Sequence, residues 1–377
     1  MLRGGCAMEP SPTECLANAL AAIEPATCDA FAQSMPRLVA FAYQRGAHRA
    51  DTGDLLGFVA DDILHTDLAE YANLIYSQLR LKNPQALIED LAWVYRTYMQ
   101  RGVSLRHFPL DLAVWCDAAD QLLDAQSAAQ IKRVYGCMGM LHGWLTEHAS
   151  TSPASRAIDA ELAPLFQGYI AALLKPDMAE AIHITSEYVT SPARLSTWWE
   201  HVIQPAMYEI GDRWAHGEIT VGQEHLATAI TQRVMAIHYP LILELPREKG
   251  AIVVAASPGE MHEIGPRLVA DLLEVGGWDV YFTGANTPAA SVVALIEQTR
   301  ARVLAISTTL TTSLPAVATL IAQVRQACRP APHILVGGQA YTSSPELWRQ
   351  IGADGFAASA RSGCDYIEAY QQSARKL

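Results

Sequence analysis

The residues best suited to chemistry in this sequence surround His262. The segment 257–265 reads Ser-Pro-Gly-Glu-Met-His-Glu-Ile-Gly, so Glu260 comes two residues before the histidine and Gly265 three residues after it. A neutral imidazole is a good transition-metal ligand, and a carboxylate that hydrogen-bonds its other ring nitrogen fixes the tautomer and the basicity. Glycine at 265 allows a ligand to approach the backbone closely. A single histidine in a loop is also common as a surface or capping residue, so the interpretation depends on the rest of the chain.

A second group of candidate residues lies about forty positions earlier. Trp214 is followed, after nine residues, by the pair Glu224-His225. Val221 precedes His225 by one helical turn, so the two side chains share a helix face. Taken alone, Trp214 is a plausible core residue and Glu224-His225 a plausible solvated helix face.

The elements that must position His262 alternate between strand and helix. Short apolar runs bounded by glycine and proline predict strands, and amphipathic segments between them predict helices. This alternation predicts a Rossmann-like (flavodoxin-like) domain over 250–377 with a parallel, doubly wound sheet. The expected strands are 251–256, 278–283, 302–307, 333–336 and 355–358, and the expected helices are 264–275, 289–300, 314–327 and a final C-terminal helix.

In such a sheet, ligands bind beyond the carboxyl ends of the strands, next to the point where the strand order reverses. This rule selects the loops that follow Ala256, Ser307 and Val336. The second loop is rich in hydroxyl groups over 307–313, and the third begins with Gly337-Gly338. Each could also be an ordinary strand–helix connection, but all three lie at the expected ligand-binding edge.

Together these segments resemble a cobalamin-binding domain. Glu260-Met-His262-Glu-Ile-Gly265 matches the family motif Asp/Glu-x-His-x-x-Gly, and Gly337-Gly338 match its paired glycines beside the nucleotide tail of the cofactor. The family also has a Ser-x-Leu motif in the nucleotide pocket, but here Leu310 comes one residue late. The candidate hydroxyl residues of this loop are Ser307 and Thr309.

The Trp-x9-Glu-His arrangement resembles the signature of B12-dependent photoreceptors of the CarH/LitR type, over roughly 160–370. The resemblance implies adenosylcobalamin as the chromophore, with His262 as the lower ligand of cobalt. Trp214 would face the adenosyl group, and Glu224 would accept hydrogen bonds from its ribose. Val221 would pack over the corrin, and His225 would become the upper cobalt ligand only after light.

The function implied is light sensing by a cytoplasmic, non-enzymatic signalling protein. Light would break the cobalt–carbon bond, adenosyl would leave, and axial ligation would rearrange. The change would alter domain contacts, self-association into a homo-oligomer, or the surface offered to a downstream protein. A corrinoid shuttle for methyl transfer is the alternative. A radical mutase subunit is a third possibility, but it would need a substrate barrel on another chain.

The stretches before the cobalamin domain read as helical. Residues 1–150 contain apolar residues at three-to-four spacing over 68–81, 84–101 and 110–123. A Ser/Thr/Pro/Ala linker follows, and 158–245 predicts a four-helix bundle that caps the upper face of the cobalamin. Thr220 and Gln223 have the spacing of a capping box at the start of one of its helices. Three domains are therefore expected: 1–150, 158–245 and 250–377.

The first 150 residues hold 11 Lys and Arg against 17 Asp and Glu, which does not suit a DNA-binding head. Their aromatic, helical character resembles the photocobilins, B12 photoreceptors that also bind a bilin, so biliverdin is a candidate second chromophore. Candidate contacts are Arg101, Arg106, His107 and Trp115, with Cys116 or Cys137 as a thioether site. Core packing is the competing interpretation for each of them.

The composition is consistent with these interpretations. Half of the residues are hydrophobic and 18% are charged, and the net charge of -12 argues against a protein that coats nucleic acid. No uncharged apolar run approaches the roughly 18–20 residues of a membrane span, and residues 1–13 do not resemble a signal peptide. The seven cysteines include no CxxC pair, which excludes a paired-cysteine zinc site and predicts free thiols in a reducing cytoplasm.

Overall fold

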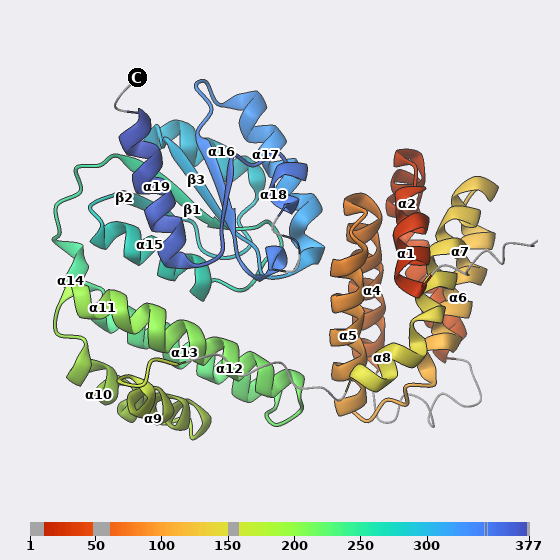
Figure 1. Cartoon of the computed structure of the whole chain (residues 1–377), viewed down its shortest axis with the longest axis horizontal. Helices are drawn as coiled ribbons and strands as arrows, with labels where there is room; N and C mark the ends of the chain where they lie inside the picture. The colour runs from red at the N-terminus through yellow and green to blue at the C-terminus, as the bar shows by residue number, and fades with distance from the viewer. Residues whose placement is uncertain (1–10, 48–60, 150–157, 343, 345, 375–377) are drawn as a thin grey trace, which may run out of the picture. The chain divides into compact units, whose positions relative to one another are not determined.

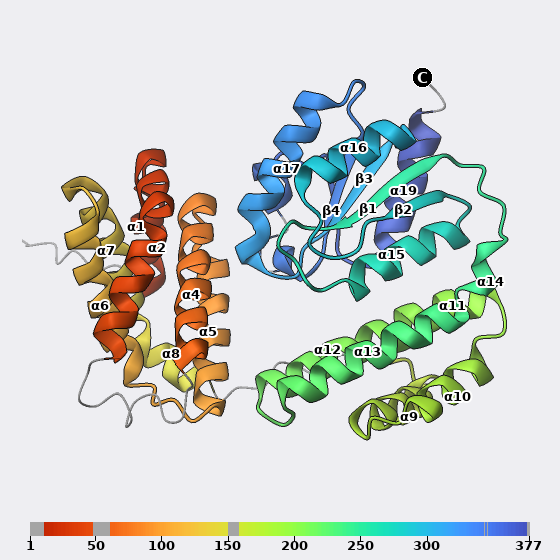
Figure 2. The same ribbon diagram turned by 180° about the vertical axis from the view of Figure 1, so that it is seen from behind.

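The structure is a computed structural model that describes residues 11–47, 61–149, 158–342, 344 and 346–374. Its internal contacts divide the chain into two compact units, Met1–Ser152 and Pro153–Leu377. Figure 1 and Figure 2 show the elements of each unit from two opposite sides. The bundle expected over 158–245 and the sheet domain expected over 250–377 both lie in the second unit.

The described part of the first unit is entirely helical, and its helices enclose one hydrophobic core. The helices predicted over 68–81, 84–101 and 110–123 are present. Asn83 caps the second of these by accepting a hydrogen bond from the Ala86 backbone N–H at 3.1 Å. The described helices are α1 (Pro12–Ala21), α2 (Pro25–Ala47), α4 (Asp61–Leu81), α5 (Pro84–Gln100), α6 (His107–Leu122), α7 (Ala125–Met140) and α8 (His142–His148).

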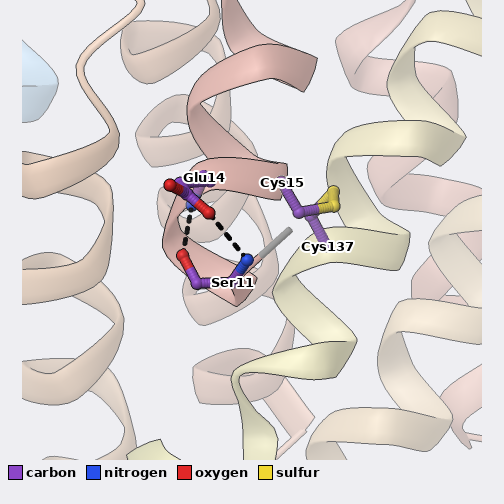
Figure 3. Close-up of a disulfide and its surroundings, with 4 residues drawn as sticks. All are labelled: Ser11, Glu14, Cys15 and Cys137. Atoms are coloured by element: carbon purple, nitrogen blue, oxygen red, sulfur yellow. Dashed lines mark hydrogen bonds between the residues drawn. A yellow bond between two sulfur atoms is a disulfide. The ribbon is translucent and has the colours of Figure 1, made fainter. Parts of the chain in front are cut away.

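A disulfide joins the first and sixth of these helices. Cys15 on α1 and Cys137 on α7 are bonded, with their Cα atoms 5.7 Å apart (Figure 3). The prediction that the cysteines are free thiols is therefore wrong for this pair, and Cys137 is not available for a thioether. The pairing could not be read from spacing, because 122 residues separate the two and only the packing of α1 on α7 brings them together. The cysteines described as free are Cys28, Cys116, Cys328 and Cys364.

The second unit begins with a four-helix bundle, as predicted. Its third helix is continuous from α11 through a π-helical turn, η1, into α12, and the capping box of Thr220 and Gln223 opens the fourth helix, α13. The bundle core also contains Ile264 and Leu268, which belong to the first helix of the sheet domain, α15 (Ile264–Val275), so the bundle and the sheet domain share apolar packing. The elements are α9 (Ala163–Leu174), α10 (Met178–Tyr188), α11 (Pro192–Trp198), η1 (Trp199–Ile203), α12 (Gln204–Ala215), α13 (Val221–His238) and the short α14 (Pro240–Leu243).

The rest of the second unit is the predicted parallel sheet, with strand order β2-β1-β3-β4-β5. Helices α15 and α19 cover one face, and α16 and α17 cover the other (Figures 1 and 2). The order reverses between β1 and β3, which places the switch point between the first and second predicted ligand loops. The strands are β1 (Ala251–Ala256), β2 (Asp279–Phe282), β3 (Val303–Ser307), β4 (His333–Gly337) and β5 (Gly355–Ala357), and the helices are α15 (Ile264–Val275), α16 (Ala289–Thr299), α17 (Leu314–Ala327), α18 (Leu347–Gln350) and α19 (Ala360–Ala374).

Among the described residues, no helix is both long enough and apolar enough to cross a membrane.

Candidate functional site

His262 lies in the loop between β1 and α15, and Glu260 fixes its orientation. The Glu260 Oε1 atom accepts hydrogen bonds from the His262 ring at Nδ1 and from the His262 backbone N–H, the latter at 3.1 Å. The Glu260 side chain is 1% exposed, whereas that of His262 is 56% exposed. The carboxylate thus holds Nδ1 from inside the loop, which leaves Nε2 as the ring nitrogen through which His262 can bind a metal.

Glu260 also joins this loop to the loop after β3. Its second oxygen, Oε2, accepts hydrogen bonds from the backbone N–H groups of Thr309 and Leu310, at 2.8 and 3.4 Å. Burial favours the neutral acid, but the bonds from His262 and from the Thr309 amide outweigh it and lower the pKa of Glu260. The hydrogen bond to Glu260 in turn raises the pKa of His262, against the effect of burial.

The three predicted ligand loops meet at one edge of the sheet. The strand register pairs Ala256 with Ser307, and Ser307 with Gly337. A Cβ atom at Gly337 would lie 2.9 Å from the Ala357 carbonyl oxygen. At Gly338, with φ +105°, it would lie 2.3 Å from the Thr308 carbonyl oxygen. Glycine is therefore required at both positions by the neighbouring backbone.

An open pocket lies at this edge. Its walls are mostly glycine, alanine and aliphatic side chains from β1, β3, β4, β5, α15 and α19, with Ser307 and Gly265 among them. An added Cβ at Gly265 would lie 3.7 Å from the Ser307 Oγ atom, so the glycine widens the slot between α15 and β3. The predicted residues Ser307, Gly265, Gly337 and Gly338 therefore line one cavity.

Thr309, a candidate hydroxyl for the nucleotide pocket, contacts the His262 loop through its backbone. The Thr309 backbone N–H donates a hydrogen bond to Glu260. Thr309 is not among the residues that line the pocket. Its contribution supports the His262 loop.

The Trp-x9-Glu-His residues lie on α12 and α13. Trp214 is half-buried near the end of α12, and the Thr220 capping box starts α13 just before Val221, which is 52% exposed. The Glu224 carboxylate contacts the His225 Nδ1 atom at 2.5 Å and accepts a hydrogen bond from the Thr228 hydroxyl at 3.1 Å. The His225 side chain is 74% exposed.

The α13 helix and the His262 loop face each other. The Gln232 side chain on α13 donates a hydrogen bond to Glu263, the residue after His262, at 2.6 Å. The negative charge of Glu224 contributes to raising the pKa of His262. The structure thus brings the helix that carries Glu224 and His225 next to the loop that carries His262.

Sequence reasoning missed several polar residues of this region. Thr228 and Gln232 hold Glu224 and the His262 loop, and Gln204 and Tyr208 of α12 line the pocket. The four-residue spacing of Glu224 and Thr228 on one helix could have indicated the first contact. No local signal places a bundle helix against the sheet-domain pocket.

The first unit holds a smaller cavity. It is lined mainly by aromatic and aliphatic side chains, with Tyr71, Tyr95, Phe108 and Asp111 among the lining residues. The predicted bilin contacts Arg101, Arg106, His107 and Trp115 are not among its lining residues. Of these, Arg101 pairs with Asp67, His107 stacks on Tyr98, and buried Trp115 donates a hydrogen bond to Asp111 at 3.0 Å.

Comparison with known proteins identifies both parts of the second unit. Residues 250–365 match a family model described as a B12 binding domain, and residues 165–238 match a second model with the same description. A dimethylamine corrinoid protein of Methanosarcina acetivorans is 26% identical over 164 residues, which are 43% of this chain and 76% of that protein. The HTH-type transcriptional repressor CarA of Myxococcus xanthus is 31% identical over 134 residues, 36% of this chain and 44% of that protein.

Among solved structures, the monomethylamine corrinoid protein of Methanosarcina barkeri aligns with a TM-score of 0.48 at 20% identity. The alignment covers 55% of this chain and 98% of that one.

The chain therefore contains cobalamin-binding domains, and two features of its structure fit that cofactor. His262 is held through Nδ1 by a buried carboxylate, so Nε2 would bind cobalt. The pocket at the sheet edge has walls of glycine, alanine and aliphatic side chains, which suit the flat base of the nucleotide tail. The described residues hold no group of three or more His, Cys, Asp or Glu that could bind a metal ion by itself.

Proposed function

We propose that this chain is a light sensor that uses adenosylcobalamin as its chromophore and acts by changing its contacts rather than by catalysis. The observation that supports the proposal is that α13, which carries Glu224 and His225, is hydrogen-bonded to the His262 loop through Gln232 and Glu263. Glu224 is oriented by Thr228, and so would offer a fixed carboxylate to a group bound at this site. A corrinoid carrier for methyl transfer must leave the reactive face of its cofactor open to a second protein. Such a carrier would have no evident use for a fixed carboxylate at that face.

When bound, adenosylcobalamin supplies a cobalt–carbon bond that light can break. His262 would hold cobalt from below through Nε2, while Glu260 keeps the proton on Nδ1. Trp214 would offer its indole face to the adenosyl group, Glu224 would accept hydrogen bonds from the ribose hydroxyls, and Val221 would pack over the corrin. Trp214 and Glu224 would have this partner only while the adenosyl group is bound.

His225 would be the residue able to turn from Glu224 and supply a further imidazole ligand to the metal. Its side chain is exposed, and its hydrogen bond among the described residues is the one with Glu224, which the rotation would break. A shift of α13 would reach the sheet domain through Gln232 and Glu263. The output would be a change in homo-oligomer contacts or in the surface offered to a downstream protein, with no direct binding of DNA.

The test is illumination of the full chain after reconstitution with adenosylcobalamin in the dark. Green light should convert the absorption spectrum irreversibly and change the mass measured by size-exclusion chromatography with light scattering. The same protein loaded with cyanocobalamin should respond in neither measurement. An unchanged spectrum under green light would contradict the proposal.

The alternative is a corrinoid carrier for methyl transfer. It is favoured by the relatives named as dimethylamine and monomethylamine corrinoid proteins. A carrier should bind methylcobalamin at least as tightly as adenosylcobalamin, whereas a sensor with Trp214 and Glu224 over the upper face should prefer the adenosyl form. Competition between the two cofactors for the dark protein decides between these functions.

Biliverdin binding by the first unit is proposed as a second chromophore function. The observation that supports it is the small aromatic cavity beside Tyr71, Tyr95 and Phe108, which would have to enlarge to hold a tetrapyrrole. Addition of biliverdin to the purified chain should produce a red-shifted absorption band that co-elutes with the protein. A bilin that elutes separately would contradict this part of the proposal.

A further inference from the structure

The pocket at the sheet edge has walls from two different parts of the second unit. Most of its lining belongs to the sheet domain, but Gln204 and Tyr208 come from α12 of the bundle. The Gln204 side-chain amide donates a hydrogen bond to the Tyr208 hydroxyl at 3.1 Å. The two side chains therefore form a hydrogen-bonded pair on one face of the helix, beside a slot that is otherwise largely apolar.

Two polar contacts attach this end of the helix to the sheet domain. Immediately before Gln204, the π-helical turn η1 carries Trp199 and Glu200. The Trp199 indole N–H donates a hydrogen bond to buried Asp271 on α15 at 2.8 Å, and Glu200 pairs with Arg361 on α19. Because α15 and α19 also wall the pocket, these contacts hold the Gln204–Tyr208 pair at its edge.

The chemistry of the pocket indicates what the pair would contact. The glycine, alanine and aliphatic walls suit a flat aromatic base. Gln204 and Tyr208 add an amide and a phenol, which suit the polar atoms of a nucleotide. The corrin ring itself would lie by His262, which does not line this pocket.

We propose that Gln204 and Tyr208 are specificity residues that recognise the nucleotide tail of the corrinoid. Because they lie on α12, binding of the tail would also restrict the motion of this bundle helix. This inference rests on the proposed cobalamin function. A ligand in the pocket would therefore contact α12, the same helix that carries Trp214 at its other end. A corrinoid without the tail would still reach His262 but would leave Gln204 and Tyr208 without a ligand, so it would add no restraint to α12.

The experiment compares hydroxocobalamin with the tail-less corrinoid diaquocobinamide, on the full chain in the dark. The wild-type chain should bind hydroxocobalamin more tightly by at least about tenfold, and Gln204→Ala or Tyr208→Ala should each reduce that ratio about fivefold. Affinity for cobinamide should stay within about twofold, because the pair does not contact the corrin. Glu209→Gln, on the same helix but outside the pocket lining, is the matched control and should leave the ratio unchanged.

A second measurement needs no substitution. Hydrogen exchange of the wild-type backbone amides over 199–208 should slow on binding hydroxocobalamin but not on binding cobinamide. Tyr208→Phe, which keeps the ring, tests the hydroxyl alone and should lower the ratio without loss of folding. If both corrinoids bind and both protect 199–208 equally, or if the variants keep the wild-type ratio, the inference is wrong while the proposed function stands. If neither corrinoid binds, the proposed function falls and the inference falls with it.

Discussion

The Glu260 carboxylate lies between two loops, and its Oε2 atom accepts the Thr309 backbone N–H at 2.8 Å while its Oε1 atom holds the His262 ring. One buried acid therefore determines the orientation of the candidate cobalt ligand and ties it to the loop after β3. A backbone N–H is available at 309 whatever the side chain. The support of His262 thus depends on the strand register rather than on the threonine hydroxyl.

Glu260→Gln should weaken corrinoid binding by about 10–100-fold, the usual cost of losing the carboxylate behind a metal-binding histidine. The neutral amide also loses the charge that favours the bound form of the ring. The dissociation constant from tryptophan fluorescence quenching by hydroxocobalamin is the measurement. Glu297→Gln, on an exposed part of α16, should bind as the wild type does. Equal affinities for the two variants would show that Glu260 does not support the ligand.

Substitution of His262 should affect cofactor binding in the dark, whereas substitution of His225 should affect only the illuminated protein. His262→Ala should weaken binding of adenosylcobalamin in the dark, because it removes the lower ligand. His225→Ala should leave the dark spectrum and affinity unchanged and alter only the spectrum of the illuminated protein. Absorption spectra before and after green light separate the two. A changed dark spectrum in His225→Ala would contradict the assigned sequence of events.

Thr228→Val should reduce the preference of the site for adenosylcobalamin over methylcobalamin by about fivefold, the value of one hydrogen bond of about 1 kcal/mol. The valine keeps the shape of the threonine but no longer donates to the Glu224 Oε1 atom. The ratio of the two dissociation constants is the measurement. Thr228→Ser keeps the hydroxyl and should restore the ratio, which a general packing defect would not allow.

Gly338→Ala should destabilise the second unit by about 1–3 kcal/mol or more, because a positive φ and a clash coincide. The added methyl would meet the Thr308 carbonyl oxygen at 2.3 Å. Gly211→Ala on α12, where nothing lies within 4 Å of the added atom, should be neutral or stabilising by up to about 1 kcal/mol. Urea unfolding followed by circular dichroism compares the two. Equal midpoints would exclude a backbone requirement at 338.

Asp271 should make the stability of the second unit depend on pH. Burial raises the pKa of this carboxyl to about 7 in the folded chain, from an ordinary value near 3.8. At pH values between these two pKa values, Asp271 is protonated in the folded chain but ionised in the unfolded chain. The free energy of unfolding should therefore fall as pH rises from about 4 to 7, by up to about 1.4 kcal/mol per pH unit, and then level off.

Asp271→Asn should remove this dependence because an amide does not titrate. Its amide oxygen can still accept the Trp199 indole N–H, so the contact between the two residues is kept. Urea unfolding at pH 5 and pH 7.5 gives the free-energy difference between the two conditions for each variant. Asp365→Asn, at an exposed position on α19, should retain the difference seen in the wild type. If Asp271→Asn retains it as well, another group is responsible.

Much of the site could be predicted because its signals are local. The strand period places Ala256, Ser307 and Val336 at strand ends, and parallel strands share their carboxyl edge, so the ligand-binding edge follows from sequence. Glu260 and His262 are two residues apart, and their hydrogen bond needs only a loop that folds back on itself. The helical cap and its Thr220 start are likewise consequences of short-range spacing.

Contacts between distant segments were decided only by the tertiary structure. The Cys15–Cys137 disulfide depends on α1 packing against α7, and no spacing rule specifies which of seven cysteines will meet. Gln204 and Tyr208 reach the sheet-domain pocket because Trp199 and Asp271 attach the bundle to α15. Periodicity determines which face of a helix is buried, but which surface that face meets depends on long-range packing of the whole chain.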